Sequence, residues 1–282
     1  MKKNLSKILF IIGFLIFIFP FALRFISYIN QTSVVYNYKS NISSMPIEEK
    51  EKKQEESDSF NKDLSDTDPI VSIEDIDNSN EPSSFDFLNT GTVIGTLSIP
   101  KINVDLPIYE GIEGDNLQKG VALLKDTSYP TAKENTHSVI AGHSGLTRAK
   151  ILDDLDKIII GDNFFIEYLG NTNCYKVVDI KVVLPNETDS LKIQNNKTLV
   201  TLVTCTPKNI NTHRLLVTGE LTQMQDKVEI STLDKIKSFI LKNIIFIIAI
   251  LFVIIILFVY IIKRIKRIKN EKNNTDGDKN ER

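Results

Sequence analysis

The sequence predicts a mainly β domain that lies between two membrane-spanning helices. Between residues 91 and 222, short runs of β-branched and aliphatic residues follow one another, and only two short segments read as helices. Uncharged apolar runs occur near both ends of the chain, at 8–23 and 244–262. Many short strands with few helices are typical of a β-sandwich or a β-barrel.

Composition narrows the function classes. The 282 residues are enough for one domain of ordinary size with appendages, and the net charge of −2 gives no indication of a nucleic-acid partner. The chain has two cysteines, Cys174 and Cys205, and three histidines, which argues against a metal site built from these residues. The count alone would allow a disulfide, but a nucleophilic cysteine has to stay reduced.

Residues 1–31 are expected to form a cytoplasmic start and a membrane anchor. Lys2 and Lys3 precede the apolar run at 8–23, and residues 25–29 extend it to spanning length if Arg24 reaches the interface. A cleavable signal peptide is the alternative. It would have a shorter apolar region and a cleavage site between small residues, and neither is evident.

Residues 32–90 form the expected extracellular stem. The mixed charge run at 48–56 indicates a solvated helix face or a linker. Residues 57–89 are rich in Ser, Asp and Asn with little apolar content, so composition alone predicts a flexible linker.

Residues 91–222 contain the predicted strands and two predicted short helices. The helices are expected near 115–120 and near 148–156, the second with Ile151, Leu152 and Leu155 on one face. Cys174 lies in a strand and is expected to serve packing alone. The strand segments are 97–99, 102–108, 139–141, 164–169, 173–184, 198–204 and 214–218.

The C-terminal part is expected to cross the membrane again. A linker at 223–243 leads to the apolar run at 244–262, and a basic tail at 263–282 follows. Positive charge beside both runs puts both termini in the cytoplasm and the domain outside the plasma membrane. Nucleic-acid binding is the alternative for the basic residues, but next to a span they favour topology and lipid headgroup contact.

The strand at 198–204 places a cysteine beside an arginine. Pro207 cannot donate to a strand ladder, so pairing should stop near Cys205. If the next strand pairs antiparallel, Arg214 lies beside Cys205 at one rim of the sheet. A guanidinium there stabilises a thiolate and can hold the oxyanion formed when the thiolate attacks a carbonyl. The alternative is that Cys205 is a small buried hydrophobic residue.

Three stretches resemble the class C, or pilin-assembling, sortases. Residues 201–219 resemble the active-site signature of that family, and 134–143 and 99–109 resemble two further parts of it. The resemblance runs from about residue 60 to about residue 221. It implies a closed, eight-stranded sortase-type β-barrel at 91–222.

The resemblance also selects the catalytic residues. Cys205 is the expected nucleophile, His143 the acid that protonates the departing amine and Arg214 the oxyanion donor. His137 and His213 are the alternatives to His143, but either can simply cap a loop. Thr204, next to the nucleophile, is expected to offer its backbone or hydroxyl to the substrate.

The implied reaction is a transpeptidation without a cofactor or a metal. Cys205 cleaves a Leu-Pro-x-Thr-Gly-like sorting signal of a pilin or surface protein after the threonine and keeps the acyl group as a thioester. A lysine amine of a pilin subunit then forms an isopeptide bond. Some relatives depend on calcium, but no acidic ligand set is identified in this sequence.

A lid is a further implication of the resemblance. Residues 60–64 followed by Asp68, Pro69 and Ile70 resemble the N-terminal lid of pilin sortases, in which an Asp-Pro-aromatic tripeptide occupies the groove. Ile70 stands where an aromatic residue is usual. The alternative is a disordered linker with a turn at Asp68 and Pro69.

Two other functions remain open at this point. A sortase that anchors proteins to a peptidoglycan precursor would share the fold, but two spans and a lid argue against it. A non-catalytic, membrane-tethered assembly scaffold would not need Cys205, His143 and Arg214 together.

Overall fold

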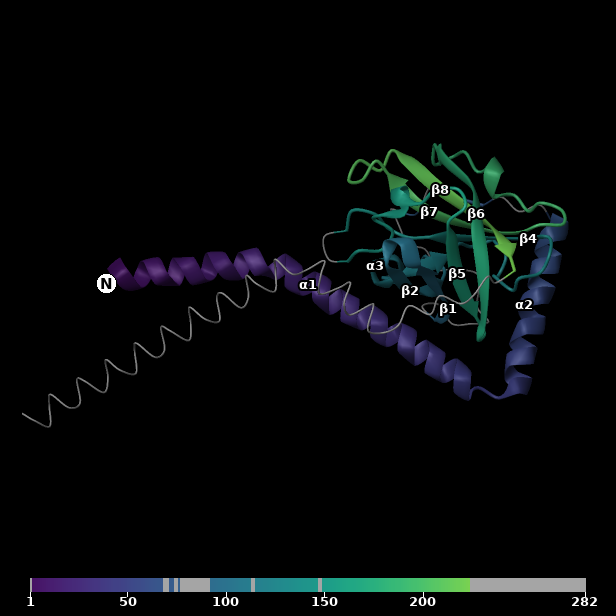
Figure 1. Cartoon of the computed structure of the whole chain (residues 1–282), viewed down its shortest axis with the longest axis horizontal. Helices are drawn as coiled ribbons and strands as arrows, with labels where there is room; N and C mark the ends of the chain where they lie inside the picture. Colours follow the sequence, from purple (N-terminus) through teal and green to yellow (C-terminus); the bar gives the residue numbers. More distant parts are fainter. Residues whose placement is uncertain are drawn as a thin grey trace, which may run out of the picture. The chain divides into compact units, whose positions relative to one another are not determined.

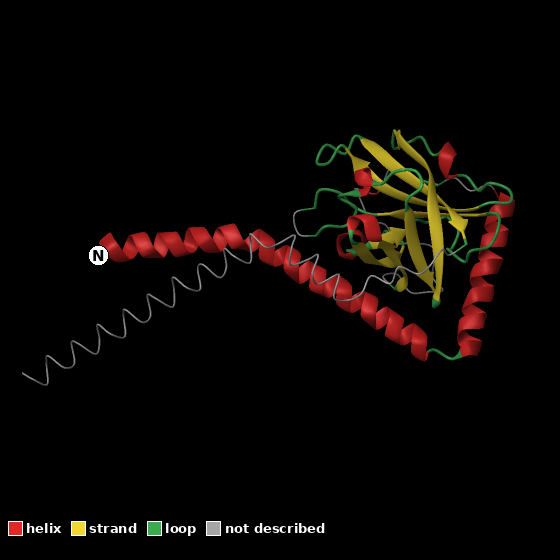
Figure 2. Ribbon diagram, viewed as in Figure 1, coloured by secondary structure: helices red, strands yellow, loops and turns green. Residues whose placement is uncertain are grey.

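The computed structural model describes residues 2–67, 71–73, 76, 92–112, 115–146 and 149–223, and these residues form two long helices followed by a β-barrel (Figures 1 and 2). The expected second span at 244–262, the basic tail at 263–282 and nearly all of the 223–243 linker lie outside the described residues.

The barrel contains eight strands and is closed, as the resemblance implied. Its strand order is β1-β2-β3-β4-β7-β8-β6-β5, and β5 pairs back with β1. The pairs β2–β3 and β4–β7 are parallel, and the other pairs are antiparallel. The strands are β1 (Val93–Ile99), β2 (Val104–Glu110), β3 (Val121–Leu123), β4 (Thr136–Ala141), β5 (Asn163–Tyr168), β6 (Asn171–Val183), β7 (Thr198–Thr206) and β8 (His213–Thr222).

Short helical segments connect the strands. The helix predicted near 115–120 is confirmed as α3 (Asn116–Lys119). The helix predicted at 148–156 is wrong, because the described part of that segment has only a 3-10 turn, η3 (Leu155–Lys157). Ile151, Leu152 and Leu155 are nevertheless buried in the barrel core. Ile102, predicted within a strand, ends the 3-10 turn η2 (Pro100–Ile102); another such turn, η4 (Asp189–Leu191), precedes β7.

Helix α1 (Lys2–Ser44) extends well past the predicted anchor. The stretch Ile12–Ser44 contains the one window in the described residues that is long and apolar enough to cross a membrane, with a mean hydropathy of 2.1. The last turns pack on the barrel, because Val35, Tyr38 and Ile42 recur at helical spacing and are buried. The Tyr38 hydroxyl also donates to the carbonyl of Ile94 over 2.8 Å.

Helix α2 (Ile47–Thr67) corrects the linker predicted from residue 57 onwards. Its buried side chains Ser57, Asn61 and Leu64 recur at helical spacing. The Asn61 carboxamide accepts a hydrogen bond from the backbone N–H of Tyr129 (2.7 Å) and donates to the carbonyl of the same residue (2.9 Å). Tertiary contacts therefore hold a helix that the polar composition did not predict. Figure 1 shows α2 running along the barrel wall.

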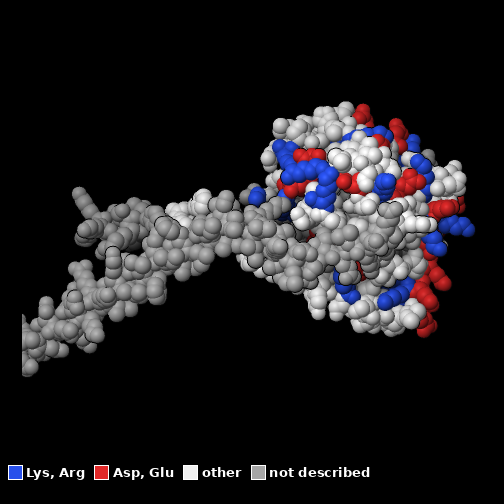
Figure 3. Space-filling view, in the orientation of Figure 1, with Lys and Arg blue, Asp and Glu red and all other residues white. Residues whose placement is uncertain are grey.

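Strand alternation divides the apolar residues into two clusters. On β7, Val200 and Leu202 point into the barrel, whereas Val203 and Cys205 belong to a second cluster on the outer face. The outer cluster continues through β4 and β8. Acidic and basic side chains are interspersed over the visible face of the barrel (Figure 3).

Candidate active site

The antiparallel pairing of β7 with β8 places Cys205 directly opposite Arg214, as predicted. The ladder continues for one more pair, Thr206 opposite His213, before Pro207. Cys205 and Arg214 are each 2 % exposed. A guanidinium that is fixed beside a thiol and shielded from water interacts strongly with the thiolate and with an oxyanion formed on it.

His143 lies just beyond the end of the parallel β4–β7 pair. The last registered residues of that pair are Ala141 and Val203. His143 follows Ala141 by two positions, the spacing that returns a side chain to the same face of a strand. Gly142 is required between them, since an added Cβ would lie 2.8 Å from Cδ1 of Leu152. Cys205, Arg214 and His143 thus lie at the same end of the barrel, and we call them the Cys205 rim.

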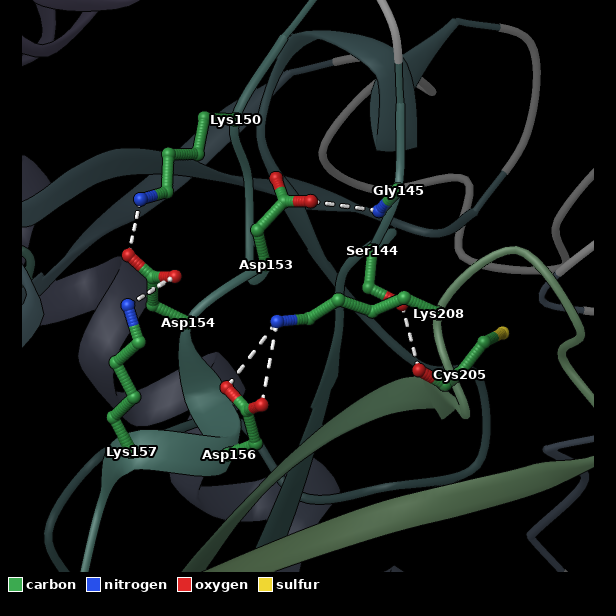
Figure 4. A network of polar contacts seen from close by, with 9 residues as sticks. All are labelled: Ser144, Gly145, Lys150, Asp153, Asp154, Asp156, Lys157, Cys205 and Lys208. Carbon is green, nitrogen blue, oxygen red and sulfur yellow. Dashed lines mark hydrogen bonds and ion pairs between the residues drawn. The ribbon is translucent and has the colours of Figure 1, made fainter.

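Hydroxyl groups tie the loop after β4 to β7. The Thr204 hydroxyl donates to the carbonyl of Gly142 over 2.7 Å, so its proton is already used in a hydrogen bond within the protein. The Ser144 hydroxyl donates to the carbonyl of Cys205 over 2.6 Å. Figure 4 shows the Cys205 sulfur pointing away from that carbonyl. Ser144 was not predicted, and its only signal in the sequence is its position directly after His143.

A segment from the stem lies over the Cys205 rim. Residues 71–73 and Ile76, which we call the covering segment, are described, whereas Asp68, Pro69 and Ile70 lie outside the described residues. Val71, Ile73 and Ile76 belong to the same buried cluster as Cys205, and Ile73 and Ile76 are fully buried. The Nε–H of Arg214 donates to the carbonyl of Ile73 over 3.0 Å. The guanidinium also donates through Nη1 to the carbonyl of Asn211 over 3.0 Å.

A cavity of about 200 Å³ adjoins Cys205, between the loop after β4 and the β7–β8 loop. Its charged walls are largely paired, because Lys208 lies 3.3 Å from an oxygen of Asp156 (Figure 4). Partial burial raises the pKa of nearby Asp154, but hydrogen bonds from Lys150 and Lys157 outweigh burial and lower its pKa to about 2. Asp154 therefore remains ionised at neutral pH.

The other two histidines have structural partners. His137 is buried, and its Nδ1 lies 2.9 Å from the carbonyl of Lys192. A carbonyl can only accept, so Nδ1 carries the proton and Nε2 accepts from the Thr201 hydroxyl at 2.7 Å. Burial lowers the pKa of His137. His213 interacts with the hydroxyl of Thr212 at the start of β8.

The remaining cysteine lies away from this rim. Cys174 is buried in β6 opposite Thr222 of β8, and it forms no disulfide with Cys205. Burial raises the pKa of Cys174 and so reduces its thiolate fraction. Within the described part of the chain, no group of three His, Cys, Asp or Glu residues is arranged to hold a metal ion.

Comparison with known proteins identifies the family. Residues 97–222 match the sortase domain family. Among solved structures, a sortase C from Clostridium perfringens, solved with the C-terminal cell wall sorting motif, is 40 % identical, with a TM-score of 0.61 over 68 % of this chain and 100 % of that chain. Streptococcus pneumoniae sortase C is 34 % identical, with a TM-score of 0.63 over 68 % of this chain and 97 % of that chain.

Curated sequences add relatives of other classes. Sortase D of Bacillus subtilis (strain 168) is 37 % identical over 118 residues, which are 42 % of this chain and 57 % of that protein. Sortase A proteins also match. The chain spans less than two thirds of the sortase D sequence, whereas it spans the whole of the C. perfringens structure. The chain therefore belongs to the sortase family of cysteine transpeptidases.

Proposed function

We propose that this chain is a class C sortase that joins pilin subunits covalently. The observation that carries the proposal is the direct cross-strand pair of Cys205 and Arg214 beneath a segment of the stem. An accessible surface cysteine would need no such cover, and a packing cysteine would need no buried guanidinium as its neighbour.

The proposed reaction has two acyl transfers. The Cys205 thiolate attacks the threonine carbonyl of a Leu-Pro-x-Thr-Gly-like signal, and Arg214 holds the oxyanion. The Thr–Gly bond breaks, His143 gives a proton to the departing glycine amine, and a thioester remains. A neutral lysine amine of a pilin subunit attacks the thioester, His143 takes up its proton, and the thiolate leaves as the isopeptide bond forms. The chain's own side chains supply every proton transfer, so the proposal includes no cofactor.

The class assignment is supported by the similarity to sortase C structures along 68 % of the chain. One of these was solved with a cell wall sorting motif, and work on the S. pneumoniae protein concerns pilin substrate specificity. The matches to sortases A and D favour one alternative, attachment of proteins to a peptidoglycan precursor. The acceptor amine distinguishes the two functions.

Residues 68–76 are proposed to be a lid. The burial of Val71, Ile73 and Ile76 with Cys205 supports a cover over the nucleophile. The bond from Arg214 to the carbonyl of Ile73 occupies the group that has to hold the oxyanion. Asp68, Pro69 and Ile70, which are proposed to occupy the groove, directly precede residues 71–73 in the sequence. A substrate peptide has to displace this segment before Cys205 can react.

The proposed location is the plasma membrane, with two passes and both termini in the cytoplasm. Helix α1 supports the first pass, and the sequence at 244–262 with its basic flank supports the second. Protease added to cells stripped of their wall should digest the 91–222 domain and spare a tag placed after Arg282. Digestion of that tag on intact membranes would contradict this topology.

Co-expression with a candidate pilin tests the catalytic proposal. Ladders that survive boiling in detergent are expected, together with an isopeptide bond between a pilin lysine and a sorting-signal threonine in tryptic digests. Monomeric pilin attached to wall fragments would instead support the anchoring function. No covalent product with either acceptor, in cells that also lack other sortases, would contradict both.

A further inference from the structure

The loop that carries His143 is tied to β7 beyond the last pair of the β4–β7 ladder. Gly142 donates a backbone hydrogen bond to the carbonyl of Val203 over 2.9 Å. Two hydroxyls then continue the connection, from Thr204 to the carbonyl of Gly142 and from Ser144 to the carbonyl of Cys205. The two hydroxyl bonds lie on either side of His143 in the chain.

These bonds are shielded from water, because Thr204 is 3 % exposed and Ser144 is 8 % exposed. A hydrogen bond in such surroundings is stronger than the same bond at the surface. Thr204 is paired with Leu215 in the β7–β8 ladder, which already fixes its position. Ser144 lies in a loop, where no ladder fixes it, so its hydroxyl bond contributes more to the position of the loop that carries His143.

Two further bonds of this loop are made within the segment after β4. The backbone N–H of Leu152 donates to the carbonyl of His143 over 3.0 Å. The backbone N–H of Gly145 donates to Oδ1 of Asp153 over 2.8 Å (Figure 4). These two bonds fold the loop on itself, and a loop held by them alone can still shift relative to Cys205. Ser144 is the residue that connects the folded loop to the backbone of the nucleophile.

We infer that Ser144 is a positioning residue, whose hydroxyl holds His143 in register with Cys205 for acyl transfer. The inference rests on the proposed function, because it assumes that imidazole and thiol act together. The bond is made to the carbonyl of Cys205 and not to its sulfur, which points the other way (Figure 4). Ser144 itself touches no reacting atom.

The test uses the full chain in detergent micelles, with Cys174→Ala so that Cys205 is the one remaining cysteine. The rate of alkylation by iodoacetamide is measured across pH, and kcat and KM are measured with a sorting-signal peptide. Ser144→Ala should lower kcat about fivefold, the effect of one neutral hydrogen bond, with KM unchanged. Its alkylation profile should shift towards that of an ordinary thiol, because the imidazolium no longer lies in place beside the thiolate.

Two variants act as controls. Ser144→Thr keeps the hydroxyl and should restore both kcat and the profile. Ser128→Ala removes another buried serine hydroxyl, which accepts a bond of 3.1 Å from the backbone N–H of His137 at the opposite end of β4. It should lower the melting temperature and leave the alkylation profile unchanged. Among the described residues, charged groups near the loop include Arg214, Asp153, Asp156 and Lys208 together with Lys150 and Asp154, and all variants retain them.

The outcomes separate the inference from the proposed function. A Ser144→Ala protein with unchanged kcat and profile overturns the inference alone. If Ser144→Ala fails to fold, Ser144→Gly removes the same hydroxyl and should give the same signature, and its absence overturns the inference equally. A parent protein whose alkylation profile is that of an ordinary thiol, and is unaffected by His143→Ala, overturns the proposed function and the inference with it.

Discussion

The Cys205 rim and the covering segment lie against each other but are held by different forces. Cys205 and Arg214 are cross-strand partners in a ladder that runs from Leu199 opposite Glu220 to Thr206 opposite His213. The covering segment is held by burial of Val71, Ile73 and Ile76 and by the hydrogen bond from Arg214 to the carbonyl of Ile73. Its apolar contacts have no directional requirement.

This difference means that the Cys205 rim is rigid, whereas the access of a substrate to Cys205 can change. A ladder residue cannot move without breaking several backbone bonds, so the Cys205 rim keeps its geometry through the catalytic cycle. The covering segment can leave at the cost of a few apolar contacts, and a substrate peptide offers similar contacts in exchange. The enzyme therefore has a fixed nucleophile under a replaceable cover. The predictions below change the Cys205 rim, the covering segment or the barrel that supports them.

Removing the nucleophile should give the largest effect. Cys205→Ala should abolish pilin ladders and peptide cleavage, because no other group in the rim can form the thioester. The covering segment keeps its Arg214 bond, so the melting temperature should stay close to that of the parent. Ladders that persist in this variant on immunoblots would contradict the assignment.

Arg214→Lys should reduce turnover by about tenfold or more, equivalent to ~1.4 kcal/mol in the barrier, because lysine keeps the charge and loses the planar fork. Loss of the Nε–H also removes the bond to Ile73, so labelling of Cys205 by small thiol reagents should become faster at the same time. Steady-state kinetics and labelling rates check the two effects. Near-normal turnover would remove Arg214 from the oxyanion role.

The sequence was sufficient to predict the pairing of Cys205 with Arg214 because this pairing follows from local patterns. Alternating β-branched residues at 198–204 and the next strand predicted a hairpin, and its register placed Cys205 beside Arg214. The resemblance added the barrel closure, which no local pattern contains. β3 was not predicted, since three residues are too few to establish a period.

The stem was harder to predict because its structure depends on partners far along the chain. Helix α2 has a polar composition, and its buried side chains face Tyr129 and Tyr168, which are 68 and 111 residues away. The predicted helix at 148–156 failed for the opposite reason. Its apolar residues are buried by the barrel, and burial alone does not require a helix.

Shortening the apolar side chains of the cover should open it without disturbing the rim. Ile73→Ala combined with Ile76→Ala removes buried methylene groups worth about 2–5 kcal/mol per residue in a core. Even a fraction of that loss in the closed state should speed thiol labelling of Cys205 by at least about fivefold. Peptide hydrolysis should rise in parallel, and Asp68→Ala with Ile70→Ala should act in the same direction.

Ile159→Ala is the matched control for the cover, because that side chain is 60 % exposed. It should leave labelling unchanged. Equal labelling rates in the parent and the Ile73/Ile76 double variant would mean that the segment does not limit access to Cys205.

Acid should destabilise the barrel more than the covering segment, since residues 71–73 and Ile76 have no ionisable side chain. Burial lowers the pKa of His137, which lies in β4, so the folded state keeps this histidine neutral. Unfolded histidine takes up a proton near about pH 6.5, so the stability contributed by His137 is present above that pH and is lost as pH falls. The decline approaches ~1.4 kcal/mol per pH unit.

Urea unfolding between about pH 7 and pH 5 measures this slope, and His137→Gln should reduce it. His213→Gln is the control, because His213 is only half-buried and lies at the start of β8. An identical slope in the parent and His137→Gln would show that other groups cause the acid sensitivity.

Substitution of Cys174 should have the smallest effect on activity. It tests whether burial or position makes a cysteine reactive in this barrel. Both cysteines are 2 % exposed, yet only Cys205 lies opposite an arginine, whereas Cys174 lies opposite Thr222. Cys174→Ala should leave kcat unchanged and lower the free energy of unfolding by about 1 kcal/mol, the typical effect of a point substitution. Burial raises the pKa of Cys174, so labelling of the native Cys205→Ala protein should be negligible on the timescale that labels the parent. Mass spectrometry of labelled tryptic peptides measures both sites at once. Comparable labelling of Cys174 would mean that the guanidinium neighbour is not what distinguishes the two thiols.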